Sequence, residues 1–256
     1  KARQNGGVAA ARNLIISNTN ADFIVFFDDD DVSAANRISE QLNSIKVCEQ
    51  GDHKKLVICH TARHVEYATG QVRYEPSLAQ NAGLKGVKGP VAEAILCGTK
   101  DKTLQGACAT CSQMARTTTY RKLGGFDENL RRSEDSEFSI RAAELEATFV
   151  GMRAPLVQQF MTHGNDKNLN IELGQWQYIF KKHRSIIERH MAYSFAIQWL
   201  ALRHKWLGRK YFTFAWRLAF LFTTSPVQTV KKIYFALPNI GVNSAMSNFH
   251  NSHESR

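Results

Sequence analysis

Four consecutive aspartates at residues 28–31 directly follow the apolar run 23–27. The run is aromatic and β-branched, and it is too short for a helix, so it predicts a buried central strand. Such a strand carries the carboxylates that follow it to the edge of a sheet where open α/β folds bind ligands. Neighbouring carboxylates repel by about 1 kcal/mol per pair even in water, so the cluster favours a cation such as Mg²⁺ or Mn²⁺. A solvated acidic turn that caps the next helix is the alternative.

A second acidic segment follows about a hundred residues later, at residues 133–137. Ser133 predicts a helix N-cap, and Glu134 and Asp135 then fall in the first turn, where acids complement the helix dipole. The dipole and the free N–H groups favour the ionised carboxylate, so Asp135 is suited to accept a proton from a hydroxyl. Simple capping would also explain acids here. If both segments serve one site, the first holds metal and phosphates and the second supplies a base.

The elements that must position these acids follow an alternating α/β pattern. A glycine-rich turn at residues 5–7 leads into an expected helix over 8–17 and then into the strand before the aspartates, as in the second half of a βαβ unit. The first strands of such a domain are expected to be missing. Further helices are expected over 36–47, 91–96 and 117–122, and strands over 55–60, 61–73, 108–116 and 148–152. We expect a partial catalytic domain over residues 1–165 and a helical region over 166–256.

Composition narrows the class of protein. The chain of 256 residues is 43% hydrophobic and 22% charged, which excludes wholesale disorder. Its five scattered cysteines favour a reducing cytoplasm, and the CxxC pair Cys108 and Cys111 is interpreted as two small core residues. The net charge of +10 suits phosphate-bearing ligands or anionic lipid. Nucleic acid is not expected as a partner, because no recognition motif occurs.

Four motifs follow one another along the chain. They are Asn5-Gly6-Gly7-Val8-Ala9-Ala10-Ala11-Arg12-Asn13, Phe26-Phe27-Asp28-Asp29-Asp30-Asp31, Gly124-Gly125-Phe126-Asp127-Glu128, and Glu134-Asp135 with Arg141. In this order they resemble family 2 glycosyltransferases over about residues 1–160. The resemblance implies the GT-A fold, an α/β sandwich of nucleotide-diphospho-sugar transferases with an Asp-x-Asp metal site.

The resemblance also implies a metal-binding set. Asp28 and Asp30 match the Asp-x-Asp pair, which would hold Mn²⁺ or Mg²⁺ on the donor diphosphate, with Asp28 also near the ribose. Asp31 matches a further acid of the family. His163 follows the last expected strand, where related enzymes often have a histidine that completes the metal shell or touches the diphosphate. A structural or surface role for His163 stays open.

Three more residues receive implied roles. Asp135 matches the catalytic base, which would deprotonate the acceptor hydroxyl for in-line attack with inversion. Glu134 would help to position the acceptor or that base. Arg12 looks like the arginine that lies beside the nucleotide in this family, and a surface helical position is the alternative.

The C-terminal region contains two apolar runs, 191–202 and 211–222, separated by the basic segment 203–210. Each run is shorter than the roughly 20 residues that span a bilayer. Aromatic residues beside lysine and arginine suit a membrane interface. A helical lid packed on the catalytic domain is an equally good interpretation.

The leading hypothesis is a metal-assisted, inverting glycosyltransferase of the hexosyltransferase type. It would move a sugar from a nucleoside diphosphate donor to a glycan or lipid-linked acceptor, in cell-surface polysaccharide synthesis. Its location would be cytoplasmic or peripheral, on the inner face of the membrane. A metal-dependent nucleotidyltransferase and a non-catalytic membrane-surface binding module are the alternatives.

Overall fold

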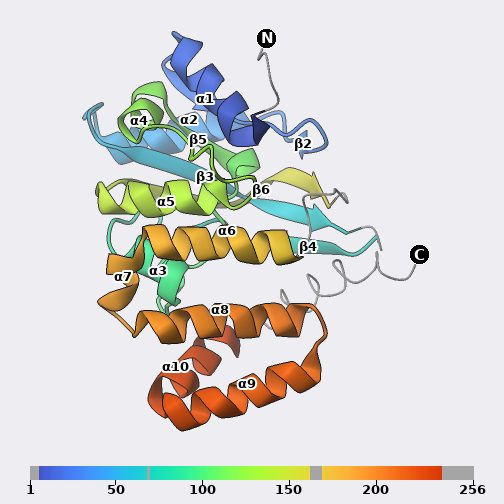
Figure 1. Ribbon diagram of the computed structural model, residues 1–256. Helices are drawn as coiled ribbons and strands as arrows, with labels where there is room; N and C mark the ends of the chain where they lie inside the picture. The colour runs from blue at the N-terminus through green and yellow to red at the C-terminus, as the bar shows by residue number, and fades with distance from the viewer. Residues whose placement is uncertain (1–5, 68–69, 162–168, 238–256) are drawn as a thin grey trace. The chain divides into compact units, whose positions relative to one another are not determined.

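The computed structural model describes residues 6–67, 70–161 and 169–237 (Figure 1). Contacts between Cα atoms divide the chain into two compact units. The first comprises residues 1–94 and 101–162, and the second comprises residues 95–100 and 163–256. The first unit is α/β, and the described part of the second is helical.

The helices between residues 7 and 144 form where apolar residues recur at helical spacing. The helices expected over 8–17, 36–47, 91–96 and 117–122 are confirmed as α1 (Gly7–Asn18), α2 (Arg37–Glu49), α3 (Val91–Cys97) and α4 (Thr117–Lys122). A further helix, α5 (Glu134–Glu144), carries the second acidic segment. In α1 the buried residues Ala9, Arg12 and Ile16 share one face, as the 3.6-residue period requires.

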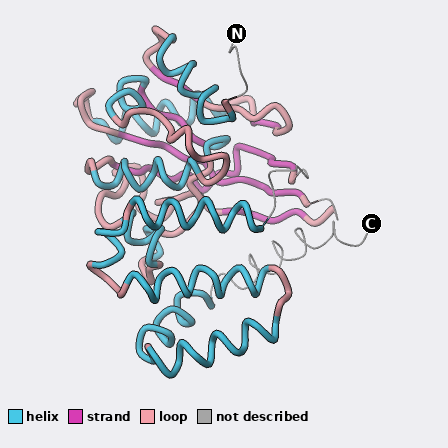
Figure 2. Tube along the Cα trace, viewed as in Figure 1, coloured by secondary structure: helices cyan, strands magenta, loops and turns pink. Residues whose placement is uncertain are grey.

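The sheet, whose strands are magenta in Figure 2, has the strand order β1-β5-β3-β6-β2, with β4 paired to β3. Its strands are β1 (Phe23–Val25), β2 (Val32–Ser33), β3 (Val57–Glu66), β4 (Val72–Glu75), β5 (Gln113–Arg116) and β6 (Thr148–Phe160). Strands β1 and β3 are both antiparallel to β5, and β3 is parallel to β6. Therefore β1, β3 and β6 run in one direction, and their carboxyl ends lie at one edge of the sheet.

Three strands differ in length from the sequence-based prediction. The expected boundary between two strands at residue 60 is wrong, because β3 continues to Glu66 in register with β6 across a bulge near Ala62. The strand expected over 108–116 covers only β5, and a 3₁₀ turn at Thr110–Ser112 precedes it. Strand β6 runs past residue 152 to Phe160. Long-range pairing extends β3 and β6 beyond their apolar segments, a property that local composition does not reveal.

The core of the first unit fills both faces of the sheet. On one face, Ile45 and Cys48 of α2 pack against Val57, Cys59 and neighbouring strand residues. On the other face, Ile24, Ile58, Ala115 and Phe149 are also buried. This two-sided burial explains why the central strands are continuously apolar.

The second unit is a set of packed helices. They are α6 (Leu169–Lys182), α7 (Arg184–Glu188), α8 (Tyr193–Leu207), α9 (Tyr211–Thr224) and α10 (Pro226–Ala236). Phe195 and Leu202 of α8 pack against Leu221 of α9, and Pro226 occupies the first turn of α10, a position that proline favours. Among the described helices, none combines the length and the apolar character needed to cross a membrane.

Candidate active site

The aspartate segment is a turn held at the carboxyl end of β1. Pairing with β5 continues one residue past β1, because the N–H of Phe26 donates to the carbonyl of Gln113 at 3.3 Å. The chain then turns, and the N–H of Asp31 donates to the carbonyl of Asp28 at 3.2 Å. The first acidic segment is therefore fixed by backbone hydrogen bonds at the edge where β1, β3 and β6 end.

A buried arginine, Arg37 of α2, holds this turn in place through hydrogen bonds. Its Nη2 donates to the carbonyl of Phe26 at 3.0 Å, and its Nη1 donates to Ser33 Oγ at 2.9 Å. Arg37 thus ties the residues before the aspartates to those after them, while its Nε donates to Gln41. Sequence reasoning missed this role because a lone arginine at the start of a helix has the pattern of a solvated residue.

Two of the four aspartates lie close to a cysteine. Carboxylate oxygens of Asp28 and Asp31 and the Sγ of Cys111 lie within 4.8 Å of one another. Asp31 Oδ1 accepts the N–H of Phe160 at 3.2 Å. Asp31 Oδ2 is buried and has no hydrogen-bond partner among the described residues. An orphaned carboxylate oxygen beside two further donor atoms fits a divalent cation.

The electrostatic environment of Asp31 also favours a bound cation. Burial raises the pKa of Asp31, and the charge of Asp28 raises it further, whereas the hydrogen bond from Phe160 and an interaction with the Cys111 side chain lower it. A bound cation would offset both the cost of burying the Asp31 carboxylate and its repulsion by Asp28. The group therefore has the charge and the donor atoms of a candidate metal site.

Two other residues, Asp30 and His163, were expected to hold metal. Asp29 and Asp30 are exposed, and Asp30 is not a member of the group that Asp28 and Asp31 form. His163 lies outside the described residues. The CxxC cysteines are buried as expected, although Cys111 also borders the aspartates.

Arg12 of α1 lies between the two acidic segments. Its Nη1 donates to Glu134 Oε1 at 2.5 Å, and its Nη2 lies 3.5 Å from Asp28 Oδ1. The guanidinium also lies 5.6 Å from the ring centroid of Phe26 and 5.5 Å from that of Phe126. One buried cation therefore joins carboxylates that are more than a hundred residues apart in the sequence.

The second acidic segment begins α5. Glu134 is buried, and burial together with the charge of Asp135 raises its pKa, while Arg12 acts in the opposite direction. Asp135 is half-buried, and its Oδ1 accepts the N–H of Ser136 at 2.6 Å. Ser133 stands at the N-cap as expected, but its backbone is left-handed at φ 61° and its side chain forms no capping bond within the described structure. The carboxylate of Asp135 bonds the first turn instead.

A glycine turn holds α5 against α1. A Cβ at Gly125, where φ is 68°, would lie 2.3 Å from Asn13 Oδ1, so only glycine fits. Asn13 in turn exchanges two hydrogen bonds of 2.8 Å with the backbone of Phe126. Arg141 of α5 donates to the carbonyl of Gly125 at 2.7 Å and pairs with Glu137. The third motif thus fixes the distance between the helices that carry Arg12 and Asp135.

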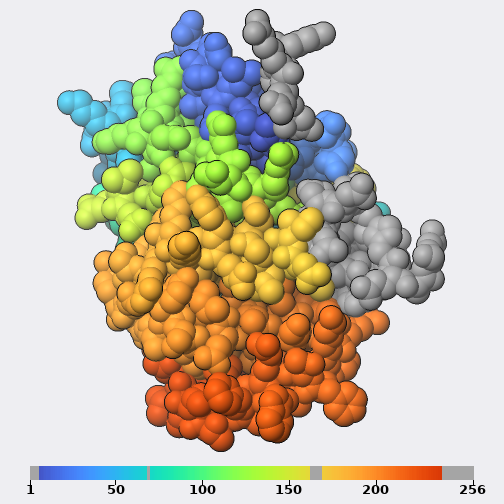
Figure 3. Space-filling model, viewed as in Figure 1, coloured from blue at the N-terminus to red at the C-terminus, as the bar shows by residue number. Residues whose placement is uncertain are grey.

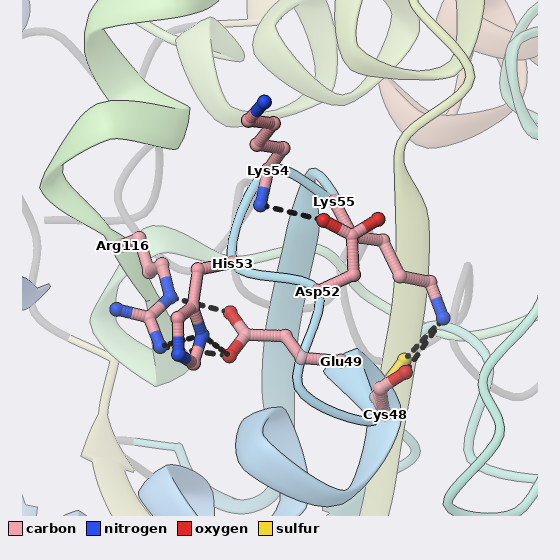
Figure 4. Close-up of polar contacts among 7 residues, drawn as sticks. All are labelled: Cys48, Glu49, Asp52, His53, Lys54, Lys55 and Arg116. Atoms are coloured by element: carbon pink, nitrogen blue, oxygen red, sulfur yellow. Dashed lines mark hydrogen bonds and ion pairs between the residues drawn. The ribbon is translucent and has the colours of Figure 1, made fainter.

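The opposite end of β1 carries another acid and arginine group (Figure 4). Arg116 pairs with Phe23 in the β1–β5 register, so it lies at the amino end of β1. Its Nε and Nη2 donate to the two carboxylate oxygens of Glu49 at 2.5 and 2.8 Å, and His53 Nδ1 lies 3.3 Å from the same carboxylate. Burial raises the pKa of Glu49, but hydrogen bonds from Arg116 and His53 lower it below its ordinary value. This end is a closed structural brace.

The fold and this geometry define an α/β domain with a candidate acidic ligand site at the carboxyl edge of its sheet. Residues 1–73 match the family model described as glycosyl transferase family 2. No curated protein matches the chain significantly. The family resemblance is thus confirmed over the segment that contains α1, the aspartate turn and α2, and it supports a glycosyltransferase in general. The second acidic segment lies beyond the matched residues.

Proposed function

We propose that this chain is an inverting glycosyltransferase that moves a sugar from a nucleoside diphosphate donor to an acceptor hydroxyl. The family match over residues 1–73 supports the general class. The observation that carries the finer proposal is the position of Arg12, which contacts Asp28 on one side and Glu134 on the other. This contact supports the assignment of the expected metal acids to one site with Glu134 and with Asp135, the expected base that follows it.

The roles follow from the contacts of the described residues. Asp28 and Asp31, with Asp30 on the same turn, would hold Mn²⁺ or Mg²⁺ against the donor diphosphate. The metal, when bound, would stabilise the charge that develops on the leaving nucleoside diphosphate. Asp135 would accept the proton of the acceptor hydroxyl. The acceptor oxygen then bonds to the anomeric carbon from the side opposite the leaving group, which takes the electron pair of the broken bond.

Glu134 would position this machinery. Its buried carboxylate is paired with Arg12 and adjoins Asp135. A glutamate held in this way orients the first turn of α5 without itself being open to the acceptor. We therefore assign proton transfer to Asp135 and positioning to Glu134.

Calorimetry with UDP as the probe tests the metal-dependent half of the proposal. Wild-type protein should bind UDP much more tightly with Mn²⁺ than without it, and Asp28→Ala should abolish the difference. Glu49→Gln, at the other end of the sheet, is the matched control and should bind as the wild type does. Metal-independent UDP binding, or none across a panel of nucleoside diphosphates, would contradict the proposal.

A donor-hydrolysis screen with common nucleotide sugars tests the chemical half. Asp135→Asn should remove activity in a glycosyltransferase, because the base is lost. A nucleotidyltransferase uses a phosphate nucleophile and would stay largely active in this variant. Retained activity in Asp135→Asn would therefore favour the nucleotidyltransferase and overturn our assignment.

We further propose peripheral attachment to an anionic membrane, which suits a lipid-linked acceptor in cell-surface polysaccharide synthesis. Residues 189–237 contain eight lysines and arginines and no acid. On α9 the side chains of Phe212, Trp216 and Phe220 follow one another at four-residue spacing and are 97%, 79% and 51% exposed. Helices α9 and α10, orange to red in Figure 3, form part of the surface of the second unit. Exposed aromatic residues beside cations are typical of interfacial helices.

Vesicle co-sedimentation tests this attachment. Binding should be strong to vesicles that contain phosphatidylglycerol and weak to pure phosphatidylcholine, and Phe212→Ser with Trp216→Ser should reduce it. Phe222→Ser, also on α9 but 40% exposed, is a control of smaller expected effect. Equal binding of the double variant would contradict the attachment without affecting the proposed reaction.

A further inference from the structure

Cys111 lies beside the aspartate turn because both segments adjoin the same end of the β1–β5 pair. In this antiparallel pair, Val25 lies opposite Met114, and the hydrogen bond from Phe26 to Gln113 continues the pairing by one position. Both segments then leave the sheet: Asp28 begins a turn, and Cys111 lies in the 3₁₀ turn Thr110–Ser112. The two turns bring the Asp28 carboxylate and Cys111 Sγ within 4.8 Å of each other.

The cysteine is held firmly in this place. The carbonyl of the next residue, Ser112, accepts a hydrogen bond of 2.9 Å from the buried amide of Gln41. The Oγ of Ser112 donates to the carbonyl of Ala109 at 2.9 Å, which closes the 3₁₀ turn. Cys111 itself is 3% exposed. These hydrogen bonds fix the backbone on which Cys111 stands.

Two features of the surroundings suit a sulfur ligand. Burial raises the pKa of the Cys111 thiol to about 12, and Arg63 of β3, whose Nη1 lies 3.8 Å from Cys111 Sγ, offsets part of this effect. Asp31 Oδ2 is the buried oxygen that has no partner among the described residues. The site thus offers one sulfur and at least two oxygen donors, with one of the oxygens unsatisfied.

We propose that Cys111 is a sulfur ligand of the metal site at Asp28 and Asp31, and that the site consequently binds Zn²⁺ or Co²⁺ more tightly than Mg²⁺. Thiolates select borderline and soft ions, whereas a site made only of carboxylates suits Mg²⁺ and Mn²⁺. On binding, the thiol releases its proton to solvent and the sulfur forms the metal bond. Zn²⁺ would compete with Mg²⁺ for the site.

This inference concerns the site of the proposed function but is measured without donor or acceptor. Co²⁺ added to the wild-type chain should give the near-ultraviolet charge-transfer band of a cobalt–thiolate bond. Cys111→Ser should lack the band. Cys48→Ser, which changes a buried cysteine at the carboxyl end of α2 (Figure 4), should keep the band.

Calorimetry supplies the second measurement. Cys111→Ser should weaken Zn²⁺ binding by about tenfold or more and leave Mg²⁺ binding within about threefold. Asp31→Asn should weaken both ions, with far-ultraviolet circular dichroism to show that each variant is folded. A band that survives Cys111→Ser, or no band in the wild type, overturns the inference. If UDP still binds with Mn²⁺ in that case, the proposed function stands and only the sulfur ligand fails.

Discussion

Both ends of strand β1 border a buried glutamate that is paired with an arginine, yet the two glutamates have pKa values shifted in opposite directions. At the amino end, Glu49 receives two hydrogen bonds from Arg116, and its pKa is lowered despite burial. At the carboxyl end, Glu134 shares Arg12 with Asp28, and its pKa is raised by burial and by Asp135. A glutamate and an arginine therefore form a fully paired ion pair at one end, and at the other end they belong to a group in which acids outnumber cations.

The difference lies in the ratio of acids to cations. One arginine serves one carboxylate at the amino end, and that arrangement stabilises the fold. At the carboxyl end, Arg12 is shared between carboxylates, and Asp31 has an unsatisfied buried oxygen in the described structure. An excess of acids over cations costs stability, and a bound cation, as we propose for this edge, would offset that cost.

The largest expected effect is on catalysis at the carboxyl end. Asp135→Asn should lower turnover of the donor by about 10³-fold, because general-base catalysis contributes about that much. Glu49→Gln should leave turnover per folded molecule within about twofold. Steady-state rates with the donor found in the screen decide the comparison, and equal losses in the two variants would show that the two ends do not differ in function.

The next effect is on stability at the amino end. Glu49→Ala should lower the free energy of unfolding by about 3 kcal/mol, because it leaves Arg116 without its bidentate partner. Urea unfolding followed by circular dichroism measures this loss. Lys54→Ala, in the exposed loop drawn in Figure 4, should change the free energy by less than about 0.5 kcal/mol. A loss no larger than that of the control would mean that Glu49 and Arg116 are not a brace.

A smaller effect separates two adjacent glycines of the carboxyl end. Gly125→Ala should cost about 2 kcal/mol, through left-handed strain and the displacement of Asn13 from Phe126. Gly124→Ala has a similar φ of 75°, but its Cβ would meet no described atom within 4 Å, so it should cost about 1 kcal/mol. Thermal unfolding of both variants measures the difference, and equal melting temperatures would exclude the Asn13 clamp.

The smallest effect is a pH dependence of opposite sign at the two ends. Since the folded pKa of Glu49 is lowered, its stabilisation is complete above its unfolded value near 4.5 and is lost as the pH falls through the folded pKa. Since the folded pKa of Glu134 is raised, its contribution is complete below that same value and is lost as the pH rises through the folded pKa.

Unfolding of wild type, Glu49→Gln and Glu134→Gln from acid to neutral pH checks these signs. The stability advantage of the wild type over Glu49→Gln should grow as the pH rises towards 4.5. Its advantage over Glu134→Gln should shrink above that pH. Each unit of difference between folded and unfolded pKa contributes about 1.4 kcal/mol. Slopes of the same sign would refute the contrast between the two ends.

Local patterns predicted the helices of the first unit well because amphipathic spacing is a property of adjacent residues. The run at residues 23–27 and the helix at residues 8–17 needed no more than a short window of sequence. The predictions failed where distant pairing decides, as in β3, which continues to Glu66 because β6 runs beside it. At Ser133 the predicted N-cap position is confirmed, but the left-handed backbone and the missing side-chain capping bond were not foreseen.

The sequence by itself determined which chemical groups stand at element ends: aspartates after a buried strand, acids in the first turn of a helix, and a glycine turn between them. The tertiary structure decided which of these groups meet. Arg12 and Glu134 are 122 residues apart, and Asp28 meets Cys111 because the turns that hold them adjoin the same end of the β1–β5 pair. Strand pairing and helix packing arise from contacts over the whole domain. For this reason no local segment could reveal that the acidic edge also holds the buried guanidinium of Arg12 and the sulfur of Cys111.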